Sequence, residues 1–146
     1  MKAILILLFI AGFVAAQPTH TIYFQLLGAA GRYSLNYEQI LPINAGMVGF
    51  SASAGASVDN NTVIDIPILL QAQIGARNQL LAGVGAEPEW YVGSGTSDYQ
   101  TLLFGSIGYR HCFKMGLILG IAVIPLYEIE TKSVYTSLGL NIGWGF

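Results

Sequence analysis

The feature that most constrains this chain is an alternation of apolar and non-apolar side chains that recurs along most of its length. In residues 134–146, for example, Leu138, Leu140 and Ile142 are separated by a glycine and an asparagine. Successive side chains of a β-strand point to opposite faces, so this period of two predicts strands with one apolar face each. After residue 16 no long uninterrupted apolar stretch remains that could span a membrane as a helix. The chain is therefore expected to be an all-β protein.

Eight segments of this kind can be recognised, and short stretches rich in Gly, Pro, Asn and Ser separate them. They cover residues 21–28, 32–41, 45–58, 62–75, 79–92, 101–111, 113–126 and 134–146. The seventh is apolar on both faces between Met115 and Pro125, and its length and glycines favour a strand over a short buried helix. Eight strands joined by short turns predict a closed antiparallel eight-stranded up-and-down β-barrel.

The composition favours a barrel in a membrane over a barrel in water. Only 10% of the residues are charged, against about 25% in ordinary soluble domains. The non-apolar faces carry mainly Gly, Ser, Gln and Asn, which suit a narrow interior better than a solvent-exposed surface. Aromatic residues lie near the strand ends, as in the girdles of barrels in lipid. They are Tyr37, Trp90, Tyr91, Tyr99, Tyr109, Tyr127, Tyr135, Trp144 and Phe146.

Residues 1–16 have the order of a secretory signal peptide. Met1 and Lys2 give a positive start, residues 3–14 form an uncharged apolar run, and small residues precede Gln17. The run is too short to cross a bilayer as a helix, which needs about 20 residues. Residues 17–146 are then the mature barrel. Its even number of strands places both mature termini in the periplasm, and its outward-facing loops are short.

Charge and motifs argue against several classes of function. A net charge of −2, without clustered Lys or Arg, predicts no nucleic-acid binding. His111 and Cys112 are adjacent, so in a strand they point to opposite faces and cannot form a catalytic dyad. His20 lies near the start of the mature chain, and two distant histidines with one cysteine offer no metal-ligand cluster. We expect no catalytic activity, no cofactor, and no metal or ligand site.

If the apolar faces point to lipid, six ionisable residues point into the lumen. They are Arg32, Glu38, Asp65, Glu87, Glu89 and Arg110. Isolated buried charges are costly, so Arg32 and Arg110 are expected to bridge some of the carboxylates in a structural network that fills the barrel. An alternative hypothesis makes Glu87 and Glu89 a catalytic pair, because residues two apart on one strand share a face at about 6–7 Å. Pro88 between them indicates a strand end or bulge near the rim.

Several short motifs occur in an order that resembles the small outer-membrane β-barrel proteins of Bacteroidota. They are residues 31–38 (GRYSLNYE), 66–68 (IPI), 105–110 (GSIGYR) and 124–126 (IPL). The terminal residues 143–146, with Trp144 and Phe146, resemble the aromatic signal by which the barrel-assembly machinery recognises its substrates. The chain departs from the family pattern at Gly120 and at His111 and Cys112. The resemblance covers the mature chain and implies the barrel fold and an outer-membrane location, but most members have no assigned activity.

Together these features predict a monomeric integral outer-membrane protein with a filled polar lumen and a structural or accessory role. Its expected partners are outer-membrane lipids and the barrel-assembly machinery. Three alternatives stay open: a narrow channel, a lipid-modifying barrel enzyme, and a soluble exported lipocalin-like barrel that binds an apolar ligand.

Overall fold

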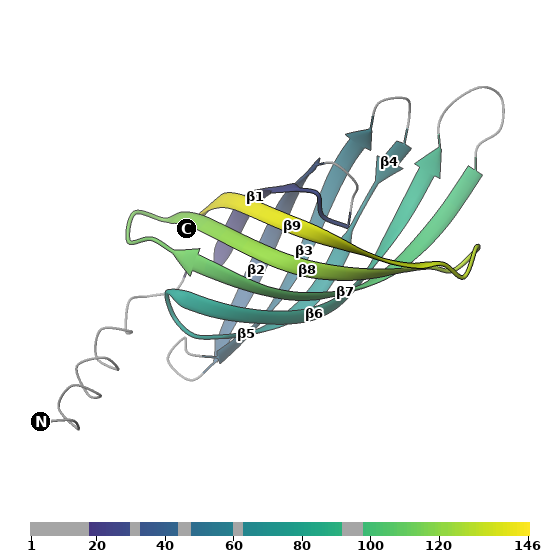
Figure 1. The fold of residues 1–146 in the computed structure, drawn as a ribbon. Coiled ribbons are helices and arrows are strands. Elements are labelled where there is room, and N and C mark those ends of the chain that lie inside the picture. Colours follow the sequence, from purple (N-terminus) through teal and green to yellow (C-terminus); the bar gives the residue numbers. More distant parts are fainter. Residues whose placement is uncertain (1–17, 30–32, 44–47, 60–62, 92–97) are drawn as a thin grey trace, which may run out of the picture.

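The computed structural model describes residues 18–29, 33–43, 48–59, 63–91 and 98–146. The expected signal peptide and Arg32 lie outside these residues. The described residues contain no helix of the length and apolarity needed to cross a membrane. The strands are β1 (His20–Leu26), β2 (Tyr33–Ile43), β3 (Val48–Asp59), β4 (Val63–Asp65), β5 (Ile68–Ile74), β6 (Asn78–Tyr91), β7 (Asp98–Cys112), β8 (Leu117–Glu128) and β9 (Val134–Gly145) (Figure 1).

β4 and β5 together form one strand of the barrel. Asp65 lies opposite Glu89 and Ile68 opposite Ala86, so the register with β6 is the same on both sides of the interruption. The interruption contains Pro67, which has no N–H to donate to the sheet. Counted in this way, the sheet has eight strands.

The sheet is antiparallel throughout and closes on itself. Neighbouring strands run in the order β2, β1, β9, β8, β7, β6, then β4 with β5, then β3, which pairs with β2 again. Figure 1 shows the strands wrapping around a single interior, with the C-terminus beside β1. The predicted closed, antiparallel, eight-stranded barrel is confirmed.

The strand limits differ most clearly from the predicted ones between the sixth and seventh predicted strands, which correspond to β7 and β8. Residues 113–116 form a turn instead of the start of a strand, and β8 begins at Leu117. The N–H of Gly116 donates to the Phe113 carbonyl at 3.0 Å. Gly116 has a φ of 94°, which side-chain-bearing residues rarely adopt, so a glycine is required at this position. Lys114 and Gly116 interrupt the apolar run at this turn.

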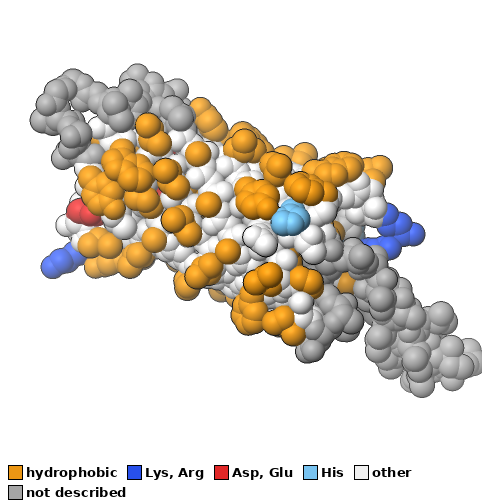
Figure 2. Space-filling model, turned by 180° about the vertical axis from the view of Figure 1, so that it is seen from behind, with side chains coloured by type: hydrophobic (Ala, Val, Ile, Leu, Met, Phe, Trp, Pro, Cys, Tyr) orange, Lys and Arg blue, Asp and Glu red, His pale blue; other side chains and the backbone are white. Residues whose placement is uncertain are grey.

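The two faces of the sheet are inverted relative to a soluble barrel. Large apolar side chains cover the outside, with Val84 and Ile107 each 69% exposed. Serines, glutamines and ionisable residues point inward, and Glu38 and Glu87 are fully buried. Figure 2 shows apolar side chains over the body of the barrel and the charged ones at its two ends.

One part of the interior is apolar, which corrects the expectation of a wholly polar lumen. Leu102, Phe104, Ala122, Ile124 and Leu126 pack together inside the barrel with Ala29, and Leu69 lies against them. The cluster comes mainly from β7 and β8. Because β8 is apolar on both faces, its inward side chains contribute a core while its outward ones stay exposed.

Candidate functional site

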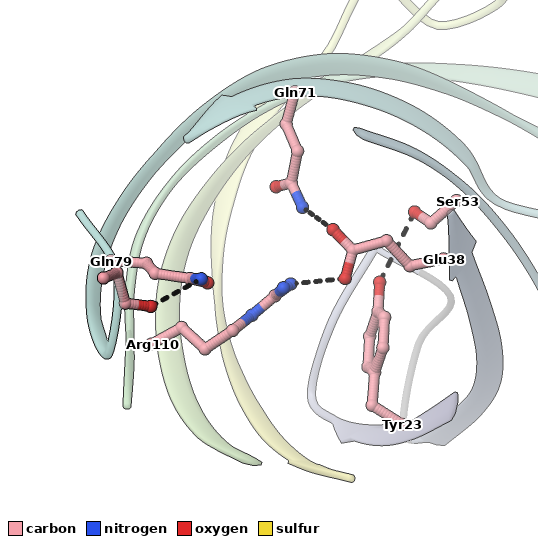
Figure 3. Close-up of polar contacts among 7 residues, drawn as sticks. Tyr23, Glu38, Ser53, Gln71, Gln79 and Arg110 are labelled. Atoms are coloured by element: carbon pink, nitrogen blue, oxygen red, sulfur yellow. Dashed lines mark hydrogen bonds and ion pairs between the residues drawn. The ribbon is translucent and has the colours of Figure 1, made fainter. Parts of the chain in front are cut away.

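A buried network crosses the lumen near the middle of β2. Nη2 of Arg110, on β7, lies 2.8 Å from Oε2 of Glu38, and both side chains are almost completely buried. Nε2 of Gln71, on β5, donates to Oε1 of Glu38 at 2.6 Å. Figure 3 shows Gln71 and Arg110 reaching Glu38 from different strands. The Glu38 charge is thus compensated by one cation and one amide.

Tyr23, on β1, extends this network toward β3. Its hydroxyl donates to Oγ of Ser53 at 3.4 Å, and the Arg110 guanidinium carbon lies 5.9 Å from the centre of the Tyr23 ring (Figure 3). That distance falls within the range of cation–π interactions. A cavity of about 20 Å³ lies between Tyr23 and Phe104, which is room for about one water molecule. Side chains therefore fill the barrel at this level.

A second group, the acidic cluster of Asp65, Glu87 and Glu89, lies nearer the end of the barrel where β3 meets β4 and β6 meets β7. One carboxylate oxygen from each residue can be chosen so that all three lie within 4.8 Å of one another. Asp65 and Glu87 are buried and Glu89 is half-buried. The strand register explains why the three carboxylates lie close together, because Asp65 on β4 lies opposite Glu89 on β6.

Hydroxyl groups bind the two carboxylates of this cluster that lie nearer the barrel end. Oγ of Ser57 donates to Oδ2 of Asp65 at 3.2 Å. The hydroxyl of Tyr91 donates to Oε2 of Glu89 at 3.0 Å. These contacts orient Asp65 and Glu89 without compensating their charge.

Glu87 is different, because both of its carboxylate oxygens are buried and neither has a hydrogen-bond partner among the residues that the structure describes. Its surroundings explain this. On β7 it lies opposite Leu102, and the register with β4 and β5 places Pro67 on its other side. The residues two positions away on its own strand are Gly85 and Glu89. None of these four side chains can donate a hydrogen bond to a carboxylate.

The sequence pattern places Glu87 and Glu89 on one face but gives no sign that Asp65 joins them. Asp65 comes from a neighbouring strand, and its level along the barrel depends on strand register. A search for histidine and cysteine ligands also misses a cluster whose donors are all carboxylates. Carboxylate oxygens are the ligands that hard cations such as Ca²⁺ and Mg²⁺ prefer, and a proton can also be shared within such a group.

The two histidines lie apart from both lumen groups, whereas Cys112 lies two residues from Arg110 on the inward face of β7. Cys112 is buried, whereas His111 lies on the other face, with its Nδ1 2.7 Å from Oδ1 of Asn78. Nδ1 of His20 lies 2.6 Å from the Tyr37 hydroxyl. The pairing of His20 with Phe146 by two backbone hydrogen bonds joins the first and last strands.

The lumen thus holds one network in which charge is compensated and one acidic cluster in which the buried Glu87 has no donor. Both are built from side chains that the barrel brings together from strands far apart in the sequence. Comparisons of this chain with protein-family models, with curated proteins and with solved protein structures find no match.

Proposed function

We propose that this chain is an integral outer-membrane β-barrel protein with a filled lumen and a structural or accessory role. The observation that carries the proposal is the inverted distribution of side chains. Leu70, Val84 and Leu138 are each more than half exposed, while Glu38, Gln73 and Arg110 are buried. In water this arrangement exposes apolar surface around the whole barrel, whereas in lipid the same surface is solvated.

Closure of the sheet supports the same proposal. An open strand edge in hydrocarbon leaves backbone N–H and C=O groups without partners, at several kcal/mol each. In this barrel β2 pairs with both β1 and β3, and the chain ends meet through β1 and β9. The backbone therefore needs no water along the body of the barrel.

The exposed aromatic residues give the height of the apolar band. Tyr99 and Tyr109 lie on the same face of β7 and are 56% and 43% exposed. The strand between them is about 33 Å long at about 3.3 Å per residue. A strand tilt of about 40° reduces this length to a height of about 25 Å, the height of the apolar band of outer-membrane barrels.

The soluble lipocalin-like alternative fits the interior less well. A barrel that binds an apolar ligand needs an apolar cavity of several hundred Å³. The enclosed cavity between Tyr23 and Phe104 is about 20 Å³, and an ion pair with its amide partner lies beside it. The filled interior also favours a structural role over the narrow channel.

Sequence features support the location and the partners. The proposed signal peptide at residues 1–16, the Bacteroidota-type motifs and the aromatic Trp144 and Phe146 together favour export and assembly into the outer membrane of a Gram-negative bacterium. Both mature termini then face the periplasm. The proposed partners are the barrel-assembly machinery and outer-membrane lipids, with the barrel itself as a monomer.

Cell fractionation followed by electrophoresis tests this proposal. The protein is expected in the outer-membrane fraction, released only by detergent, and its unboiled form is expected to migrate differently from its boiled form because the closed barrel resists unfolding. Recovery from the periplasm without detergent would contradict the proposal and favour the soluble lipocalin-like barrel.

A further inference from the structure

We propose that Asp65, Glu87 and Glu89 form a binding site for one divalent cation, with Ca²⁺ as the preferred ion. This inference goes beyond the proposed function and does not depend on where the barrel resides. It rests on the position of three carboxylates at one level of the lumen and on the buried, unpartnered state of Glu87.

Glu87 supplies the reason for a ligand. Its side chain is fully buried, neither oxygen has a donor within the described part of the chain, and the other two members of the cluster are carboxylates as well. A buried carboxylate in such surroundings is strongly unfavourable unless a proton or a cation compensates it. The Arg110 guanidinium is engaged with Glu38. A cation bound among the three carboxylates would compensate all of them together.

The type of donor and the flexible coordination of Ca²⁺ favour this ion. Ca²⁺ binds oxygen at about 2.3–2.6 Å, so two ligands on opposite sides of the ion lie about 4.6–5.2 Å apart. Mg²⁺ needs the same two oxygens about 4.0–4.2 Å apart and demands stricter octahedral geometry. The three oxygens lie within 4.8 Å of one another, a limit compatible with either ion, so the preference for Ca²⁺ rests on its tolerance of irregular coordination. Zinc and other softer metals prefer imidazole and thiolate ligands, which this cluster lacks.

The neighbouring hydroxyls complete the arrangement. Ser57 and Tyr91 each donate to one outer carboxylate, at 3.2 Å and 3.0 Å. Such contacts hold metal-ligating carboxylates in a fixed orientation. Both oxygens of Glu87 and the other oxygen of Glu89 then face the ion, with the Asp65 carboxylate beside them.

A hollow at the barrel end lies next to the acidic cluster. It has a volume of about 320 Å³, and its wall includes Tyr91, Gln100, Glu128 and Glu130. Tyr91 links the hollow to the cluster, because its hydroxyl contacts both Glu89 and Gln100. Acidic walls raise the local concentration of cations. The acidic wall of the hollow thus favours the approach of a divalent cation.

Calcium binding to the purified, folded protein tests the proposal. After treatment with EDTA and dialysis, the protein is titrated with Ca²⁺ by calorimetry, and its unfolding temperature is measured with and without the ion. One Ca²⁺ per chain is expected to bind, with a dissociation constant at or below about 1 mM, as in extracellular calcium modules. The unfolding temperature is expected to rise with Ca²⁺ concentration.

The Glu87→Gln variant keeps the shape of the side chain and removes its charge. It is expected to bind Ca²⁺ about tenfold more weakly or not at all, and to be more stable than the unmodified protein in EDTA because the cluster then holds one buried carboxylate fewer. Glu130→Gln removes an exposed acid from the wall of the hollow and is the comparison variant, expected to weaken Ca²⁺ binding far less than Glu87→Gln because Glu130 is not among the three carboxylates of the cluster. Should Glu87→Gln fail to fold, Glu89→Gln replaces it.

Two results would overturn the proposal. Unchanged Ca²⁺ binding in the folded Glu87→Gln or Glu89→Gln variant would place the ion elsewhere. Absence of binding to the unmodified protein would mean that a proton or Arg32, which lies outside the described residues, compensates Glu87. An Arg32→Gln variant distinguishes these two, since Ca²⁺ binding would appear only if Arg32 had been the counter-ion. Equal affinity for Mg²⁺ would overturn the preference for Ca²⁺.

Discussion

At the scale of single residues, the lumen is defined by which side chains have partners. Glu38 receives Arg110 and the Gln71 amide, and it is fully buried with them. Glu87 is equally buried, and none of the described residues gives it a cation or a hydrogen-bond donor. The difference follows from their neighbours, because Glu38 faces long polar side chains across the barrel whereas Glu87 lies between Pro67 and Leu102.

The Arg110→Met variant is expected to lose about 3–5 kcal/mol of unfolding free energy, because it leaves the Glu38 charge buried without its cation. The double variant Glu38→Gln with Arg110→Met is expected to lose less than the single one, since no unpaired charge remains. Urea unfolding followed by tryptophan fluorescence measures both. A double variant less stable than Arg110→Met would mean that Glu38 is stabilised by groups other than Arg110.

Inward-facing glycines make room for large neighbours. A Cβ added at Gly143 would lie 2.5 Å from the Cβ of Tyr23 and would also meet the Ile22 carbonyl oxygen. Gly143→Ala is therefore expected to destabilise the barrel by about 1–3 kcal/mol through overpacking. Gly105→Ala is the control, because the nearest atom to its added Cβ is 3.3 Å away, on the Pro125 ring. Equal unfolding curves for the two variants would show that Tyr23 can move aside.

At the scale of strands, the alternation of side chains determines which face of the sheet a residue occupies but not its position along the barrel axis. It correctly predicts eight strands, their antiparallel closure and the burial of Glu38, Asp65, Glu87 and Arg110. It cannot predict that Asp65 meets Glu87 and Glu89, because side chains on different strands meet according to the stagger between strands. It also misses the apolar cluster around Ile124, since a strand that is apolar on both faces carries no alternation to interpret.

The outward face of β9 gives a test of the surrounding solvent. Leu140 is 46% exposed and lies about midway between Tyr135 and Trp144. Leu140→Arg is expected to cost about 2–4 kcal/mol in a lipid bilayer, where a charge near the midplane is poorly solvated. Val134→Arg, at the strand end, is expected to cost about 0–1 kcal/mol. Unfolding from lipid vesicles measures both, and equal small effects would indicate that water surrounds β9.

At the scale of the whole molecule, charge is distributed unevenly between the two ends of the barrel. Seven of the eight acidic residues lie in the half that contains the connections from β3 to β4, β6 to β7 and β8 to β9, and the eighth is Glu38 near mid-barrel. The seven are Asp59, Asp65, Glu87, Glu89, Asp98, Glu128 and Glu130. With both termini in the periplasm, as proposed, this acidic end faces outward. The proposed cation site lies at the same end.

The filled interior predicts how the whole barrel behaves as a conductor. Ions need a continuous water path, but the Glu38–Arg110–Gln71 network crosses the lumen beside a cavity of about 20 Å³, which holds about one water molecule. The unmodified protein in planar bilayers is therefore expected to give no stepwise conductance. Replacing all three network residues with alanine removes the side chains that block this level and is expected to produce conductance steps. Conductance steps in the unmodified protein would contradict a filled lumen and favour the narrow channel, because they would show that the network does not block the passage of ions.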